Sequence, residues 1–303
     1  MKHVRYCDDI LIVGRSRADC AGMTDIALAT LDQFGFAVAA SKTVHATQRI
    51  EFLGVDIDSI ACVVACPARR LQELRGLLAF HISHSPLRPV RTVLSLIGKL
   101  SFAAHVLPGA RPFLRHLIDL CRGRRRGMMT LDPSAIDDLR YWRRHLSIWN
   151  GRQPWLLASA TTTLATDASL QGWGGLVVSS SAHLPAHLAV GSGVAGAWCD
   201  RDRPHIIDHR GIGWAELFAV LAMAAFIAPS IPNSSLVLLV DNRADCDIIN
   251  RQSTRSSRIL PLLRSLYDLA TRHNISLFAR HLPGVDNSQA LTTELFRLEM
   301  TVF

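Results

Sequence analysis

Apolar and polar positions form short alternating runs at the start of the chain. Two largely apolar runs, residues 3–6 and 10–13, flank Asp8 and Asp9, which predicts a β-hairpin with two carboxylates at its tip. Residues 24–34 have the apolar spacing of a helix, and the glycine that follows ends it.

Two more strands are predicted within residues 50–64, separated by Gly54 and by a turn at residues 56–59. From residue 68 to about 150 the apolar spacing becomes helical. Asp132 followed by proline is typical of a helix start, because the aspartate caps the helix and proline suits its first position. The apolar stripe of that helix is Leu139, Trp142, Leu146 and Trp149.

Residues 150–161 predict a linker, since they hold glycine, proline and a Ser/Ala/Thr run. Beyond them strands and helices alternate. The predicted strands are 163–167, 173–179, 194–199, 236–240 and 275–281, and the predicted helices are 214–228, 243–251 and 257–272. The helix at 214–228 is apolar on nearly all sides, which predicts burial.

Composition indicates a globular protein, with 49% apolar and 19% charged residues. The best candidate for a membrane helix, Leu217–Ala228, is shorter than the roughly 18 residues required, and Asp8 and Asp9 interrupt any signal-peptide layout. We therefore expect an intracellular protein, in cytoplasm or nucleus, with no membrane partner. Seven scattered cysteines predict neither a disulfide framework nor a zinc site.

The net charge of +8 is distributed unevenly. Residues 1–160 carry 22 Lys and Arg against 13 Asp and Glu, whereas residues 161–303 carry 11 against 12. A basic half beside a near-neutral half indicates that the basic half binds a polyanion. The alternative is a solvated surface of arginine-rich composition, since thirty arginines stand against three lysines. Charge alone leaves both interpretations open.

Three carboxylates of the second half stand where carboxylates are costly. Asp167 ends an apolar strand, Glu216 lies in the first turn of the most apolar helix, and Asp241 closes an apolar strand. Buried carboxylates need a partner or a metal ion, and all three can converge on one edge of a sheet. We therefore predict a site for divalent cations, two of which can assist phosphodiester cleavage.

Each of these residues also has an ordinary explanation when taken alone. Asp167 would belong to a turn, Glu216 would be favoured by the helix dipole, and Asp241 would cap the next helix. Their joint order along the chain favours the site.

Three motifs in this order carry a family resemblance. Thr166-Asp167-Ala168-Ser169 with Gly172-Trp173-Gly174, then Trp214-Ala215-Glu216-Leu217, then Asp241-Asn242, resemble the ribonuclease H domain of retroelement reverse transcriptases. The tail 282–290 is similar to that domain as well, so the resemblance covers roughly residues 160–297.

The resemblance implies a ribonuclease H-like α/β fold, with a mixed five-stranded sheet and helices on both faces. It also implies cleavage of the RNA strand of an RNA–DNA hybrid, with Mg²⁺ or Mn²⁺ held by Asp167, Glu216 and Asp241. The family has a fourth acidic residue at the start of its last helix, where by register this chain has Leu291. We expect this difference to weaken one metal position and to lower activity.

The first half resembles the reverse-transcriptase palm. Tyr6-Cys7-Asp8-Asp9, then residues 35–42, then Phe52-Leu53-Gly54, are similar to its catalytic hairpin, lysine segment and primer grip. Residues 96–111 are similar to the thumb and connection, most closely those of DIRS-like and related LTR-type retrotransposons. The resemblance implies that Asp8 and Asp9 are catalytic and that Asp8 is a metal ligand.

The resemblance divides the chain into three parts: a partial palm at residues 1–66, a helical thumb and connection at 67–150, and the ribonuclease H-like domain at 160–303. Because the chain begins five residues before the catalytic hairpin, we expect upstream fingers and palm to be missing partners. On that basis no polymerase activity is expected from this chain alone.

The arginines of the helical part are interpreted as contacts to nucleic acid phosphates. This spread includes Arg88, and the strongest candidates are Arg111, Arg115, Arg122, Arg124, Arg125 and Arg126. The expected partners are an RNA–DNA hybrid and a template–primer duplex.

The sequence leaves two main functions open. One is a reverse transcriptase and ribonuclease H fragment that retains hybrid-dependent nuclease chemistry. The other is a catalytically decayed remnant that binds nucleic acid without cutting it, and a host-recruited binding protein is a third. Metal binding at the three carboxylates discriminates between the first two.

Overall fold

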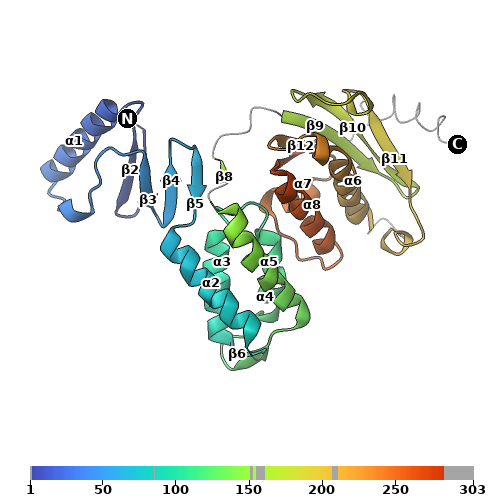
Figure 1. Cartoon of the computed structure of the whole chain (residues 1–303), viewed down its shortest axis with the longest axis horizontal. Helices are drawn as coiled ribbons and strands as arrows, with labels where there is room; N and C mark the ends of the chain where they lie inside the picture. Colours follow the sequence, from blue (N-terminus) through green and yellow to red (C-terminus); the bar gives the residue numbers. More distant parts are fainter. Residues whose placement is uncertain (1, 85, 151–152, 155–160, 207–210, 283–303) are drawn as a thin grey trace.

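The protein is described by a computed structural model at residues 2–84, 86–150, 153–154, 161–206 and 211–282 (Figure 1). It is a mixed α/β structure with a five-stranded mixed sheet and flanking helices, as the sequence predicts. Short 3-10 helices lie at Ala40–Lys42 (η1), Ala186–Leu188 (η3), Arg203–His205 (η4) and Ala228–Ser230 (η6).

The predicted N-terminal hairpin is confirmed. β1 (Lys2–Tyr6) pairs in antiparallel fashion with β2 (Asp9–Val13). The helix that follows, α1 (Arg17–Gln33), begins seven residues before its predicted start. The Ser16 side chain accepts a hydrogen bond from the Asp19 backbone amide and so caps the helix there. No residue of α1 is buried, so its first turns carry no apolar stripe from which to predict them.

The two strands predicted within residues 50–64 are three: β3 (Arg49–Phe52), β4 (Val55–Asp58) and β5 (Val63–Ala65). The predicted turn at residues 56–59 is wrong, because Asp56 pairs inside the sheet. The predicted break at Gly54 is confirmed, because the first turn lies at Leu53-Gly54, where φ is 50° and 75°. Two successive residues with positive φ form the tight hairpin turn that suits the twist of β-strands.

Part of the predicted linker belongs to this sheet. β8 (Gln153–Pro154) pairs with β5, which gives the strand order β3-β4-β5-β8. The Asn150 side chain holds the chain before β8 close to the end of β5. It donates a hydrogen bond to the Cys66 carbonyl at 3.0 Å and accepts one from the Cys66 amide at 2.8 Å. The two residues are 84 positions apart, so the local pattern gives no sign of this pairing.

The middle of the chain is helical, as predicted. Its elements are α2 (Ala68–Ser83), α3 (Val90–Ala103), η2 (Arg111–Leu114), α4 (Arg115–Leu120) and α5 (Pro133–Trp149), with a small pair β6 (Leu87–Pro89) and β7 (Met128–Thr130). The Asp132 side chain caps α5 by accepting from the Ala135 amide at 2.7 Å. The predicted apolar stripe of α5 is buried in one hydrophobic cluster with α2, α3 and α4.

Arg88 corrects the interpretation of the basic surface. Its side chain is buried, with 4% of the residue exposed. The guanidinium donates to the carbonyls of Leu87 and Phe80 and to the ring of His81. Arg88 therefore holds the end of α2 and cannot contact a phosphate.

The second half forms the five-stranded sheet. Its strands are β9 (Thr161–Ala168), β10 (Gly172–Ser180), β11 (Gly193–Ala197), β12 (Ser235–Val240) and β13 (Ser276–His281), in the order β11-β10-β9-β12-β13. β9, β10 and β11 are antiparallel neighbours, whereas β12 runs parallel to both β9 and β13. The helices are α6 (Ile212–Ile227), α7 (Arg243–Arg251) and α8 (Leu260–His273).

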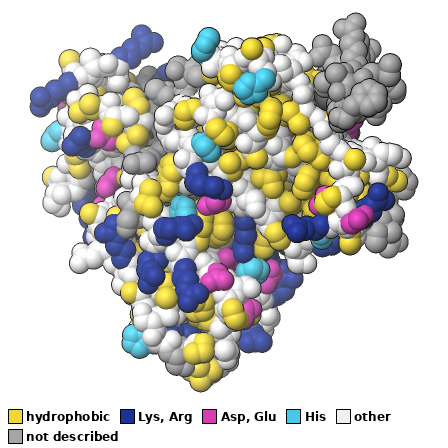
Figure 2. Space-filling view, turned by 45° about the vertical axis from the view of Figure 1, so that its right-hand side comes forward, with side chains coloured by type: hydrophobic (Ala, Val, Ile, Leu, Met, Phe, Trp, Pro, Cys, Tyr) yellow, Lys and Arg dark blue, Asp and Glu magenta, His cyan; other side chains and the backbone are white. Residues whose placement is uncertain are grey.

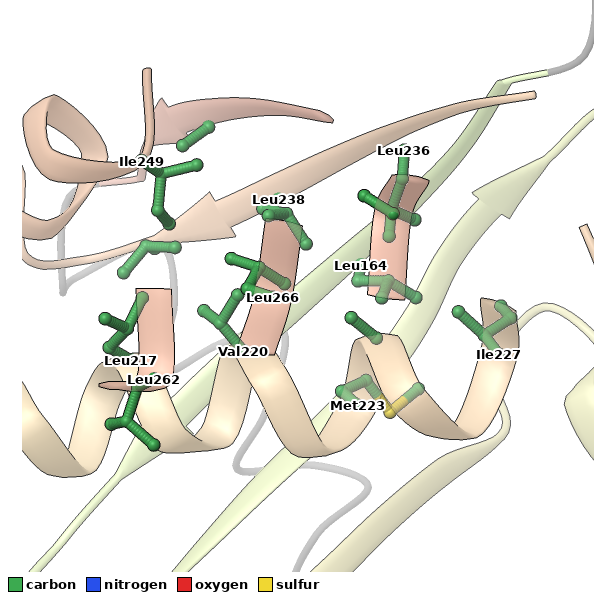
Figure 3. Close-up of a cluster of buried hydrophobic side chains, with 14 of the residues drawn as sticks. Leu164, Leu217, Val220, Met223, Ile227, Leu236, Leu238, Ile249, Leu262 and Leu266 are labelled. Carbon is green, nitrogen blue, oxygen red and sulfur yellow. The ribbon is translucent and has the colours of Figure 1, made fainter. Parts of the chain in front are cut away.

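One face of this sheet packs on the three helices. Figure 3 shows leucines of β9 and β12 directed at α6, with α7 and α8 contributing to the same cluster. The labelled members are Leu164, Leu217, Val220, Met223, Ile227, Leu236, Leu238, Ile249, Leu262 and Leu266. The helices that the structure describes in this half all contribute to this cluster, on one face of the sheet. The prediction of helices on both faces is therefore confirmed for that face and stays a prediction for the other.

The length of α6 corrects one expectation. Together with η6 it spans Ile212–Ser230, and this stretch is long and apolar enough to cross a membrane by length and composition. More than half of it is buried inside the fold, and it carries Glu216. A helix in the core of a protein is also apolar on all sides, because it contacts other elements on all of them. Burial in the fold therefore accounts for the composition of α6.

The helical part and the five-stranded part are joined through α8. Arg264 of α8 donates to the Asp138 carboxylate of α5 at 2.8 Å and to the Pro112 carbonyl at 3.4 Å. Asp138 is 1% exposed. Nearby, Gly109 lies so close to α8 that a side chain there would collide with Thr271. The contact is therefore close-packed and contains a buried ion pair.

We expect Arg264→Met to destabilise the protein by about 3 kcal/mol, because it leaves the Asp138 carboxylate buried without its cation. Urea denaturation would measure the loss. Arg272→Met on the same helix is the control, since Arg272 pairs with Asp268 on the exposed surface and should change stability by no more than about 0.5 kcal/mol. Equal effects of the two substitutions would contradict the prediction.

Candidate metal centre

The three predicted carboxylates converge. Asp167 lies near the end of β9, Asp241 directly follows β12, and Glu216 belongs to α6. Each offers a carboxylate oxygen, and these three oxygens all lie within 4.8 Å of one another. Within the described part of the chain, no other set of three or more His, Cys, Asp or Glu side chains is gathered in this way.

Strand pairing explains the convergence. β9 and β12 are parallel neighbours with Leu239 opposite Ala165. Continuing that register by two residues brings Asp241 beside Asp167 at the carboxyl ends of both strands. The apolar run of β12 is buried inside the sheet, which fixes the place where Asp241 emerges.

The ordinary explanations for these residues do not hold in the structure. Asp167 pairs with Gly174 inside the sheet and is not part of a turn. Glu216 lies beyond the first turn of α6, where the helix dipole has little effect. Asn242, and not Asp241, caps α7, because its side chain accepts from the Ala244 and Asp245 amides.

The backbone amide of Ala168 holds two of the carboxylates. It donates to Asp167 Oδ1 at 2.9 Å and lies 3.3 Å from Glu216 Oε1. Glu216 is 3% exposed, and its second oxygen, Oε2, is buried with no hydrogen-bond partner. A buried carboxylate oxygen without a partner is costly unless a cation binds there.

The pKa shifts of these carboxyls also favour a bound cation. Burial, and then the charges of Asp241 and Asp167, raise the pKa of Glu216 to about 9. Burial and the charge of Asp241 also raise the pKa of Asp167. The metal-free cluster therefore disfavours its own negative charge. An all-oxygen, anionic set of ligands fits Mg²⁺ or Mn²⁺ and not a soft metal.

Asp8 and Asp9 lie apart from any such group. Both are exposed, and they belong to the β1–β2 hairpin, in which Asp9 pairs with Tyr6. No third His, Cys, Asp or Glu side chain joins them among the residues that the structure describes. Their catalytic role stays a prediction.

The arginine candidates differ from one another. Arg111, Arg122 and the run Arg124, Arg125 and Arg126 are exposed. Arg115 is half-buried and pairs with Asp119, which also pairs with Arg122. Figure 2 shows Lys and Arg side chains gathered in the lower half of the molecule, where the helical part lies. Arg111 and the run at 124–126 are exposed and form none of these ion pairs, so they are the candidates best placed to contact phosphate.

A further buried carboxylate that the sequence pattern does not predict is Asp245, in the first turn of α7. It is 1% exposed, and its Oδ2 atom is buried without a hydrogen-bond partner. An aspartate three residues after an asparagine cap is ordinary at a helix start, so its burial has no signal in the sequence. Leu291, the predicted departure from the family, lies outside the described residues.

No protein-family model and no curated protein matches the sequence. Among solved structures, a foamy viral protease–reverse transcriptase in complex with an RNA/DNA hybrid is 14% identical, with a TM-score of 0.46 over 94% of this chain and 36% of that one. A foamy viral protease–reverse transcriptase in complex with dsDNA is 13% identical, with a TM-score of 0.45 over 93% of this chain and 55% of that one.

The N-terminal RNase H domain of a Mycobacterium tuberculosis protein, fused to maltose-binding protein, is 13% identical, with a TM-score of 0.35 over 47% of this chain and 96% of that one. This chain spans 36–55% of the length of the foamy viral chains. At these identities and TM-scores, the chemistry of this chain must be judged from its own residues.

We expect Glu216→Gln to stabilise the metal-free protein by about 1 kcal/mol at neutral pH, because it removes a carboxyl that must take up a proton on folding, at little cost in volume. The raised pKa of Glu216 lowers the stability of the wild type as pH rises from 4.5 towards 9, and the variant should lose the part of the pH dependence that Glu216 contributes. Urea denaturation in EDTA measures both effects.

The same variant should lose the stabilisation that added Mg²⁺ gives to the wild type. Asp247→Asn is the matched control, since Asp247 is an exposed carboxylate on α7 paired with Arg251. A Glu216→Gln protein that is less stable than wild type in EDTA would contradict the prediction.

Proposed function

We propose that this chain is a ribonuclease H that cleaves the RNA strand of RNA–DNA hybrids with the help of Mg²⁺ or Mn²⁺. The observation that carries the proposal is the set of three carboxylate oxygens within 4.8 Å of one another, one of which belongs to a side chain that is 3% exposed. Such a costly arrangement, placed where the ends of two parallel strands meet a buried helix, supports a site with a purpose beyond stability.

Asp167, Glu216 and Asp241 would hold the cation. Bound there, a divalent cation would supply Lewis acidity for water and neutralise negative charge on the phosphate. The Ala168 amide orients the carboxylates of Asp167 and Glu216 towards each other. Burial of Glu216 in α6 keeps solvent water from its carboxylate, which strengthens its attraction for a cation.

The basic helical part supports a nucleic-acid substrate. We propose that Arg124, Arg125 and Arg126 contact the phosphates of the hybrid, joined by Arg111 and Arg122, and that Arg115 mainly orients Asp119. The buried Arg264–Asp138 pair joins α5 of that part to the half of the chain that carries the carboxylates. This connection supports a substrate that contacts both.

The motif order supports a finer assignment. We propose a retroelement origin of the DIRS-like or LTR type, with a partial palm at residues 1–66, a thumb and connection at 67–150, and the nuclease domain at 160–303. The hydrophobic clusters fit the last two parts, because one is drawn from residues 66–149 and the other from residues 164–279.

The test is cleavage of a labelled RNA–DNA hybrid by the purified chain in Mg²⁺ and in Mn²⁺. We expect Asp167→Asn to reduce cleavage at least 100-fold, because it removes one of the cation-binding carboxylates, and Asp247→Asn to leave it unchanged. Cleavage that survives Asp167→Asn would overturn the proposal.

The alternative is a decayed remnant that binds the hybrid without cutting it, and Leu291 at the fourth acidic position favours it. The variant Leu291→Asp should therefore be assayed alongside. Hybrid binding without cleavage by either chain would favour the remnant.

A separate measurement addresses the arginines. We expect the triple substitution of Arg124, Arg125 and Arg126 by alanine to weaken hybrid binding about 10-fold at low salt. The slope of log K against log salt should become less steep by about 2.7, since each of the three lost phosphate contacts removes roughly 0.9. Fluorescence anisotropy across a salt series measures both.

The matched control replaces Arg251, Arg255 and Arg272, three exposed arginines of the near-neutral half. It changes the net charge by the same amount. An equal loss of binding in the control would show that total charge, and not this run, governs the affinity.

A further inference from the structure

Asp245 is a buried carboxylate that the proposed mechanism does not use. It lies three residues after the Asn242 cap of α7, and it is 1% exposed. Its Oδ2 atom is buried and accepts no hydrogen bond. An aspartate in a first helical turn is stabilised by the helix dipole without being buried, so the dipole explains its place in the sequence but not its burial.

A structural role as a cap does not explain it either. In a capping box, the acidic side chain three residues after the cap accepts from the backbone amide of the cap residue. Asp245 has no such bond, and the Asn242 side chain already accepts from the Ala244 and Asp245 amides. Its carboxylate therefore contributes no helix cap.

The carboxylate of Asp245 faces the helix that carries Glu216. A Cβ atom at Gly213, in the first turn of α6, would lie 3.7 Å from each of the two Asp245 oxygens. Because residue 213 is glycine, α6 places no side chain of its own over these oxygens at this position, and the Nδ2 atom of Asn242, 3.6 Å from the same Cβ position, is their side-chain neighbour there. Glu216 lies one turn further along α6 and also has a buried oxygen without a partner.

Asp241 lies four residues before Asp245 in the chain, just ahead of α7. Its charge raises the pKa values of Asp167, Glu216 and Asp245, and the charge of Asp245 also raises the pKa of Glu216. The space beside Gly213 is bordered by both Asp245 oxygens and by the Asn242 amide, and no positively charged side chain contributes to the pKa shifts of these carboxylates. Such a space attracts a small divalent cation.

We propose that Asp245, together with Asp241, holds a second divalent cation beside Gly213, so that α7 supplies a fourth carboxylate to the metal centre. This inference rests on the proposed function, since it shares Asp241 with the first cation. With Asp245 as a ligand, the metal centre would hold two cations, although the sequence has Leu291 at the family's fourth acidic position.

The test is a Mn²⁺ titration of the full chain, with free Mn²⁺ measured by electron paramagnetic resonance. We expect the wild type to bind two ions and Asp245→Asn to bind one. Gly213→Ala should also bind one ion, because its methyl group covers the Asp245 oxygens. This variant keeps every carboxylate, and alanine favours the helix by about 1 kcal/mol, so that a loss of binding cannot be due to unfolding.

Asp247→Asn is the matched control on α7 and should bind two ions. Retention of two ions by Asp245→Asn or by Gly213→Ala would overturn the inference, as would a wild type that binds one ion. If that one ion is lost in Asp167→Asn, the proposed function stands while the inference fails. A wild type that binds no Mn²⁺ would defeat both.

Discussion

Mutual repulsion among carboxylates is the constraint around which the second half of the chain is built. Oxygens of Asp167, Glu216 and Asp241 lie within 4.8 Å of one another, and the repulsion opposes folding in the absence of a cation. Backbone packing must hold them in place, because side-chain partners do not. The buried strand β12, its parallel pairing with β9 and the apolar surfaces of α6 supply that force.

Helix α6 serves two demands at once. Its apolar residues fill the core between the sheet and α8, and Glu216 is its one charged residue. Packing on several sides fixes the rotation of the helix and therefore the direction of the Glu216 carboxylate. A helix with a polar outer face would leave that direction less defined. The strongly apolar composition that brings α6 within the range of membrane helices is thus explained by its burial among other elements, which also fixes the direction of the Glu216 carboxylate.

The same helix connects the centre to the basic part of the molecule. α6 packs against α8, and Arg264 of α8 forms the buried ion pair with Asp138 of α5. Arginines that would contact phosphate and carboxylates that would bind cations are therefore linked through packed elements and not through a loose tether. A duplex that contacts both must match the spacing that this connection sets.

Much of this could be read from the sequence, because the relevant signals are local. The apolar runs, the Asp132 cap and the acidic residues at strand ends predicted the elements and the three carboxylates. Non-local contacts decided the rest. β8 depends on a partner strand far away in the sequence, and Arg88 and Asp245 are charged residues whose burial only the packing of other elements creates. A local pattern records which residues are apolar, but the tertiary structure decides which polar residues lose their water, and at Asp245 that loss is what points to a cation.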